Sequence, residues 1–169
     1  MPSPLGLVCL ARTLSGLIRV DFQTGNRPIQ VPHCWQQDPD MLRAALQQMQ
    51  EYFAAQRQHF TLELAPRGTP FQQRVWRALQ HIPFGSTLTY QALARQLGMP
   101  GAARAVGHAN GRNPIAIVIP CHRLIGSDGR LRGYAGGLAL KQRLLQHEGI
   151  DCDVLPRTSP RAIADSLRM

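Results

Sequence analysis

The sequence contains no apolar run long enough to cross a bilayer. It has 169 residues, and none of its apolar stretches approaches the ~20 residues that a membrane-spanning helix needs. Its opening, MPSPLGLVCLARTLSG, lacks the charged start and the longer apolar core of a secretory signal. We therefore expect a cytoplasmic protein without a membrane partner.

The cysteines show no metal-ligand spacing. Cys9, Cys34, Cys121 and Cys152 stand apart, without the CxxC or Cys/His patterns of a zinc site. Four such residues in a cytoplasmic chain are not a disulfide framework either. The sequence predicts free thiols and no bound metal.

Acidic residues are scarce over residues 66–147. This block holds Asp128 as its single acid, against ten arginines and Lys141, and it accounts for the chain's formal net charge of +9. The five acids of residues 1–65 are balanced by five arginines. A concentrated positive block is typical of a protein that binds nucleic acid, and a merely solvated basic surface is the alternative.

Residues 1–65 have the pattern of a small α/β unit. Two short strands flank a polar turn at 13–16, and residues 60–66 alternate like a third strand. Between them a helix begins after Asp38, its N-cap, with Pro39 in the first turn. The apolar residues expected on one face of this helix are Leu42, Ala45, Leu46, Met49 and Phe53.

Residues 66–150 have the pattern of a mostly helical unit. Thr69 and Gln72 form a capping box at the start of one helix, whose expected core residues are Phe71, Val75, Trp76 and Leu79. Thr89 caps a second helix, which stops at Gly98.

A third helix from about Ala102 to Asn110 follows after a short turn. Two short helices joined by a turn that contains glycine are typical of a helix-turn-helix, although plain helical hairpins share the pattern. The third helix is rich in Ala and Gly, with Arg104 and His108 on one side, so it can approach another surface closely. Inside the basic block this favours nucleic-acid binding.

The segment NPIAIVIPCHR places a thiol beside an imidazole and a guanidinium. We expect it to run extended up to Pro120, so that Cys121 sits on a stiff, mostly buried segment. Such a cysteine is often only a small hydrophobe. To act as a nucleophile it needs a base, because only a few per cent of an ordinary thiol is ionised at pH 7.

His122 is the nearest base. In an extended chain its side chain points away from Cys121, so a bridging water would have to carry the proton. The imidazole also needs an orienting carboxylate. We choose Glu148, which ends a helix where its charge opposes the helix dipole; an ordinary glutamate at a frayed end is the alternative.

Four segments, GTPFQQRVW, RAVGHANGRNP, PCHRLIG and GYAGGLALKQRLLQHEG, resemble the O6-alkylguanine-DNA alkyltransferases in order and spacing. The resemblance is close over about 67–150 and looser over 1–65. It implies an α+β protein of two domains. Residues 1–65 would form a ribonuclease-H-like α/β domain with a short antiparallel sheet. Residues 66–150 would form a helical domain with a helix-turn-helix and the active-site cysteine, and 151–169 a tail.

The same resemblance implies an activity. Cys121 would accept the alkyl group of O6-alkylguanine in double-stranded DNA, and O4-alkylthymine is a further candidate substrate. His122 would act as base through water, Glu148 would orient it, and Asn113 would support the turn that bears the thiol. Tyr90 would donate a proton to the leaving guanine. The resemblance also implies a monomer without a cofactor or an obligate protein partner.

It further implies where DNA and base lie. Arg104 would fill the gap left by a flipped nucleotide, and the other DNA-contact residues would be Ala102, Ala103, Gly107, His108, Arg112 and Arg123. The wall of the guanine pocket would comprise Tyr134, Ala135, Gly136 and Leu124. Leu124 replaces the family's usual Val, and Ala135 replaces a common Ser.

Two other functions fit parts of the pattern. A DNA-binding regulator without chemistry would bind a specific sequence and tolerate loss of the Cys121 thiol. A cysteine hydrolase would use Cys121, His122 and Glu148 on an ester or peptide, although no segment supplies an evident oxyanion site.

Overall fold

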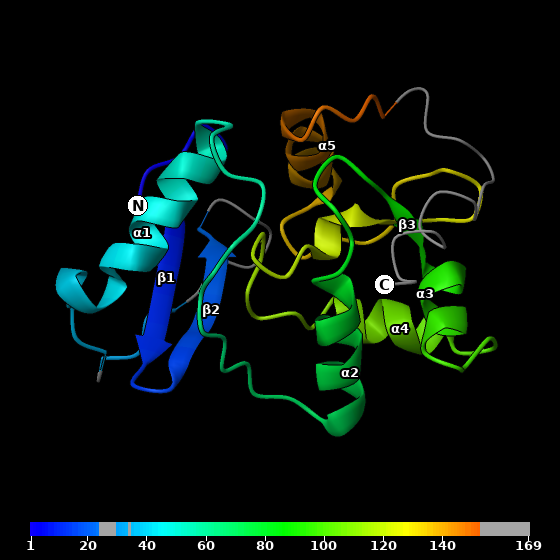
Figure 1. Cartoon of the computed structure of the whole chain (residues 1–169), viewed down its shortest axis with the longest axis horizontal. Helices are drawn as coiled ribbons and strands as arrows, with labels where there is room; N and C mark the ends of the chain where they lie inside the picture. The colour runs from blue at the N-terminus through cyan, green and yellow to red at the C-terminus, as the bar shows by residue number, and fades with distance from the viewer. Residues whose placement is uncertain (24–29, 34, 153–169) are drawn as a thin grey trace.

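The computed structural model describes residues 1–23, 30–33 and 35–152. Its elements fall into two groups that lie side by side (Figure 1). The first group comprises β1 (Val8–Thr13), β2 (Gly16–Phe22) and α1 (Pro39–Phe53). The second comprises α2 (Pro70–Leu79), β3 (Leu88–Thr89), α3 (Tyr90–Gln96), α4 (Ala103–Asn110), the 3₁₀ helix η1 (Cys121–Arg123), β4 (Leu124–Ile125) and α5 (Leu138–His147).

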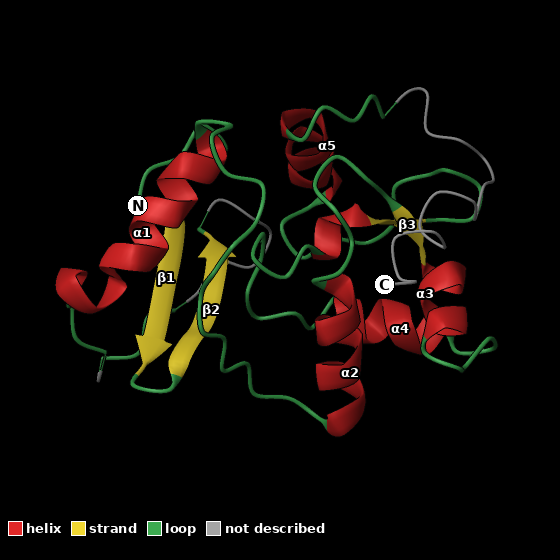
Figure 2. Ribbon diagram, in the orientation of Figure 1, coloured by secondary structure: helices red, strands yellow, loops and turns green. Residues whose placement is uncertain are grey.

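The small N-terminal domain is built on an antiparallel hairpin. β1 and β2 pair from Val8↔Phe22 onward, with a bulge at Ala11/Arg12, as the sequence predicted for the two strands. α1 lies across one face of this hairpin (Figure 2). Its predicted cap is confirmed, since the Asp38 side chain accepts a hydrogen bond from the amide of Met41.

The buried face of α1 differs in part from the prediction. Ala45 and Met49 are buried as expected, and Tyr52, which was not predicted, is fully buried with them. Tyr52 follows Met49 by three residues and therefore shares its face. The other predicted core residues of this helix are only half-buried: Leu42, Leu46 and Phe53.

The predicted strand over residues 60–66 is wrong. Only Leu64 pairs there, in an isolated bridge with Leu17. Three residues further along β2, Val20 pairs instead with Ile115. Two segments thus share the free edge of β2, and residues 60–66 have no room to continue a ladder.

The predicted helix starts of the second group are confirmed. Thr69 and Gln72 form the reciprocal capping box of α2, and the Thr89 side chain accepts a hydrogen bond from the α3 amide of Ala92. The Trp76 indole donates to the carbonyl of Ala109 at 2.9 Å, which joins α2 to α4.

The two groups share one hydrophobic core. Val20 of the hairpin and Tyr52 of α1 belong to the same buried cluster as Leu79 and Ile119 of the second group. The bridge between Val20 and Ile115 runs across the same boundary. The segment that leads to the cysteine is therefore anchored on the N-terminal domain.

Candidate active site

The chain just before Cys121 is folded into turns, so the predicted extended conformation is wrong. The amide of Ile119 bonds to the carbonyl of Ile115 at 3.0 Å, and Ile117 has a φ of +70°. Positive φ is unusual for a β-branched residue and has to be held by its surroundings. Apolar β-branched residues favour an extended strand, but the turns prevail here.

Asn113 holds this turn. Its Oδ1 accepts from the amide of Ile115 at 3.0 Å, and its Nδ2 donates to the carbonyl of Ile119 at 2.8 Å. Asn110, which the sequence did not single out, donates from Nδ2 to the carbonyl of Cys121 at 3.2 Å. Two asparagines thus fix the backbone on either side of Pro120.

The Cys121 thiol is buried, with 6% of the residue exposed. Burial raises the pKa of the Cys121 thiol, while a hydrogen bond from Asn113 and the charge of Lys141 act in the opposite direction. The thiol is therefore protonated at neutral pH, and its use as a nucleophile requires a base.

His122 lies beside it in η1 and is fully buried. Its Nε2 lies 2.8 Å from Oε1 of Glu148. Because a carboxylate only accepts hydrogen bonds, Nε2 must carry the proton and Nδ1 is left as the basic nitrogen. Nδ1 has no hydrogen-bond partner among the residues that the structure describes. Burial lowers the pKa of His122, partly offset by Glu148, so the imidazole is neutral at pH 7.

Glu148 forms the centre of a buried network. Its Oε1 accepts from the hydroxyl of Tyr52 at 2.9 Å as well as from His122. Its Oε2 accepts from Nε of Arg123 at 2.8 Å and from the amide of Gly85 at 3.3 Å. Burial raises the pKa of Glu148, but hydrogen bonds from His122 and Arg123 outweigh it and lower the pKa to about 2. A frayed-end glutamate would have none of these partners.

The prediction that Arg123 contacts DNA is wrong. Only 5% of the residue is exposed, and its guanidinium is used inside the protein. Nε and Nη2 donate hydrogen bonds to the two oxygens of Glu148, and Nη1 donates to the carbonyl of Ile82 at 2.5 Å. A buried carboxylate needs such a cation, and Arg123 supplies it.

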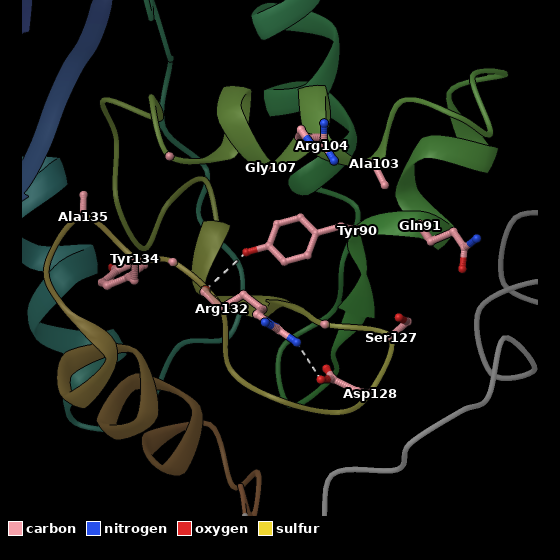
Figure 3. A pocket seen from close by; sticks show the side chains of 13 residues that line it. Tyr90, Gln91, Ala103, Arg104, Gly107, Ser127, Asp128, Arg132, Tyr134 and Ala135 are labelled. Carbon is pink, nitrogen blue, oxygen red and sulfur yellow. Dashed lines mark hydrogen bonds and ion pairs between the residues drawn. The ribbon is translucent and has the colours of Figure 1, made fainter.

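A pocket of about 1040 Å³ is lined by residues of α3, α4 and the loop that contains Arg132 and Tyr134 (Figure 3). In Figure 3 the Tyr90 ring projects across it, and its hydroxyl donates to the carbonyl of Arg132 at 3.3 Å. Burial, and then the charge that Cys121 carries once it is ionised, raise the pKa of Tyr90 to about 12, so the thiol of Cys121, which does not itself line the pocket, is electrostatically coupled to a residue that does. The same two causes raise the pKa of Tyr134. Both tyrosines therefore keep their proton at neutral pH.

The structure brings only some of the predicted residues together around this pocket. Those that line it are Tyr90, Ala103, Arg104, Gly107, Tyr134 and Ala135. His108 and Arg112 are exposed outside it, and Ala102 and Gly136 do not line it. The prediction for Leu124 is wrong, since this residue is fully buried in the core.

No contact within the described part of the protein requires glycine at position 107. An added Cβ would meet the Tyr90 ring at 3.7 Å, which is ordinary van der Waals contact. The residue lines the pocket, so the close approach that the sequence suggests would have to come from a partner.

Lys141 is a site residue that the sequence reasoning missed. It is fully buried, and its Nζ donates to the carbonyls of Leu124 at 2.5 Å and Arg132 at 2.7 Å. Burial lowers its pKa to about 8. It precedes Leu144 and Leu145 by three and four residues, a spacing that marks the buried face of a helix. It ties the pocket loop that contains Arg132 to β4.

No group of three or more His, Cys, Asp or Glu residues within residues 1–23, 30–33 and 35–152 is placed to hold a metal ion. No helix among the described residues has the length and apolar character needed to span a bilayer. Cys9 and Cys121 carry free thiols, while Cys34 and the predicted tail after residue 152 lie outside the described residues.

Two family models cover nearly the whole chain. The model described as "6-O-methylguanine DNA methyltransferase, ribonuclease-like domain" matches residues 1–66. The model described as "6-O-methylguanine DNA methyltransferase, DNA binding domain" matches residues 70–150.

Individual relatives agree with these models. A methylated-DNA–protein-cysteine methyltransferase of Methanosarcina acetivorans is 49% identical over 87% of this chain and 94% of the relative. One of Mycolicibacterium paratuberculosis is 52% identical over 86% of this chain and 88% of the relative. The crystal structure of Mycobacterium tuberculosis OGT in complex with DNA superposes with a TM-score of 0.81 at 47% identity, covering 88% of this chain and 89% of that one.

Proposed function

Because the chain belongs to the 6-O-methylguanine DNA methyltransferase family, we propose that it repairs DNA by moving the alkyl group of O6-alkylguanine onto the sulfur of Cys121. The observation that carries this proposal is a buried thiol at Cys121 followed by a buried His122, whose imidazole is held at 2.8 Å by the buried carboxylate of Glu148. The pocket volume of about 1040 Å³ is ample for a purine.

The chemistry is one displacement. The sulfur of Cys121 forms a bond to the alkyl carbon while the bond from that carbon to guanine O6 breaks. The thiol proton passes through water to Nδ1 of His122, and Glu148 stabilises the imidazolium that results. The phenol of Tyr90 gives its proton to guanine N3, so that guanine leaves as a neutral base. No group of the site can cleave the thioether, so the thiol is not regenerated and each molecule acts once. The transfer needs no cofactor.

Access to the base requires nucleotide flipping. An O6-alkyl group lies inside the base stack, and extrusion of the nucleotide costs a few kcal/mol. We propose that α3 and α4 act as a helix-turn-helix whose small-residue helix enters the minor groove. Ala103 and Gly107 allow the approach, and Arg104 fills the space left in the duplex. The other arginines of the basic block, except Arg123, are exposed, and we propose that they contact phosphates, although Arg130 and Arg132 first have to leave Asp128.

Residues 1–65 and 66–150 would be the two domains, the first ribonuclease-H-like, and the protein would act as a monomer on double-stranded DNA. The same pocket would admit O4-alkylthymine. The OGT structure bound to DNA supports DNA as the partner of this chain.

Replacement of Arg104 by Ala should slow repair of a duplex and spare the reaction with free O6-benzylguanine. Arg104 is exposed on α4 at the pocket edge, and a free base needs no extrusion. We expect a rate loss on duplex of about 10-fold to 100-fold, the scale of a few kcal/mol of extrusion cost. Single-turnover rates on both substrates measure it. Arg77→Ala is the matched control, because Arg77 is exposed on α2 and does not line the pocket. Equal losses on both substrates for Arg104→Ala would rule out the flipping role.

The proposed function itself is tested by stoichiometry. A duplex with O6-methylguanine should lose its methyl groups in a number equal to the protein molecules added, and then the reaction should stop. Repeated turnover, or hydrolysis of esters and peptides, would favour the cysteine hydrolase. Sequence-specific binding without loss of methyl groups would favour the regulator.

A further inference from the structure

Glu148 receives a hydrogen bond from the other half of the chain. The hydroxyl of Tyr52, near the end of α1, donates to Oε1 at 2.9 Å across the shared core. Tyr52 is fully buried, and Glu148 is its hydroxyl's partner at a sequence distance of 96 residues. A hydroxyl at this depth is costly unless it is bonded, so its position is well determined.

Tyr52 is itself firmly held. Its ring packs against Phe60 with centroids 5.6 Å apart and edge-on against Phe84 at 6.1 Å. The His147 ring lies 4.9 Å away, and Nε2 of His147 donates to the carbonyl of Tyr52 at 2.8 Å. α1 and α5 are thereby joined next to the network, and the end of α1 faces α5 in Figure 1. The hydroxyl cannot swing away from the carboxylate without disturbing this cluster.

We propose that Tyr52 is a positioning residue for the transfer reaction. Its hydroxyl fixes the Glu148 oxygen that holds His122. The N-terminal domain therefore completes the active site, although it contributes no group that touches the guanine. This inference rests on the proposed alkyl transfer. The N-terminal domain would then contribute to the reaction itself, although neither the proposed DNA-binding residues nor the acceptor thiol belong to it.

The hydrogen bonds to the Glu148 carboxylate determine in which direction loss of the Tyr52 hydroxyl shifts the titration of His122. Oε1 accepts from three donors: the hydroxyl of Tyr52, Nε2 of His122 and Nη2 of Arg123. Oε2 accepts from Arg123 and the amide of Gly85, and the charge of Lys141 on α5 also acts on His122. When one donor is removed, less of the carboxylate charge is neutralised and more of it acts on the imidazole. The protonated form of His122 is then stabilised.

Tyr52→Phe is the test, because it keeps the ring and removes only the hydroxyl. We expect the imidazole of His122 to titrate at a higher pH than in the wild type, followed by ¹⁵N NMR and assigned with a His122→Asn variant. The acidic limb of the single-turnover pH profile should move to higher pH with it. The plateau rate should fall about tenfold, as for one charge-assisted hydrogen bond, with unchanged affinity for the duplex.

Phe60→Leu is the matched control. It disturbs the same aromatic cluster but leaves the hydroxyl in place, so the titration of His122 should stay at the wild-type pH. An unchanged His122 titration in folded Tyr52→Phe, or an equal shift in Phe60→Leu, would overturn the proposal. The NMR titration needs no DNA, so it can be read even if the wild type fails to transfer a methyl group; that failure would count against the proposed function alone.

Discussion

Cys121→Ala should bind a duplex with O6-methylguanine as tightly as the wild type and take up no methyl label. The side chain is buried and makes no DNA contact of its own in the proposed complex, so only the acceptor is lost. Alanine leaves a small space and keeps the turn that Asn113 holds. A gel-shift titration and transfer of radioactive methyl from the duplex measure the two properties.

Cys9→Ala is the control for this experiment. Cys9 carries a free thiol on β1, and burial raises its pKa, so it should not compete for the alkyl group. This variant should take up one methyl group per chain, as the wild type does. Label on Cys9 or Cys152 in the Cys121→Ala protein would refute the assignment of the acceptor.

Glu148→Gln should lower both the rate of transfer and the stability. The amide cannot stabilise an imidazolium as the carboxylate does, and loss of general base catalysis typically costs ~100-fold or more. It also leaves the buried guanidinium of Arg123 without a counter-ion, which costs about 3–5 kcal/mol of unfolding free energy. Glu51→Gln breaks the more exposed pair with Arg57 and should cost less than about 1 kcal/mol. Urea unfolding and single-turnover rates measure these effects, and equal losses for the two variants would contradict the network.

The stability loss of Glu148→Gln should depend on pH in a stated direction. The pKa of Glu148 lies at about 2 in the fold, against 4.5 for an unperturbed glutamate. A carboxyl whose pKa is lowered by folding stabilises the protein above its unfolded pKa and loses that contribution as pH falls. The difference between wild type and variant should therefore be largest above pH 4.5 and shrink toward pH 2. A difference that grows on acidification would contradict the ionised network.

Local patterns predicted most of the helices because their signals are short-range. The caps at Asp38, Thr69 and Thr89 each depend on residues within one turn, and all three form as expected. Gly98 adopts a φ of +73° just after α3, as a helix terminator does. Such features depend on residues within about one helical turn and can therefore be read from the local sequence.

The predictions fail where contacts outside the local sequence pattern determine the conformation or the burial of a residue. Residues 60–66 alternate like a strand, but the edge of β2 is shared with Ile115. The apolar run before Cys121 suggests extended chain, but two asparagines fold it into turns. Arg123 belongs to a basic block by sequence, yet burial of Glu148 draws it inward. Ile115 and Glu148 are remote in sequence from the segments they affect, whereas Asn110 and Asn113 are nearby but lie outside the apolar run.

The sequence predicted the reacting residues of the site better than the residues that hold them in place. Proximity in sequence gave Cys121 and His122, and the unfavourable place of Glu148 at a helix end, before the resemblance implied the same role, gave the carboxylate that the structure places against His122. Tyr52 and Lys141 were missed because their signals are those of ordinary core positions on amphipathic helices. Only the fold shows that their polar ends meet the network and the pocket loop.

Intact-mass analysis with peptide mapping, after the protein is mixed with a duplex that bears O6-methylguanine, tests the central claim most directly. The account predicts that the chain gains the mass of one CH₂ group, located on the peptide that contains Cys121, while the duplex regains unmodified guanine. A chain of unchanged mass beside a duplex that still carries its methyl group would contradict it.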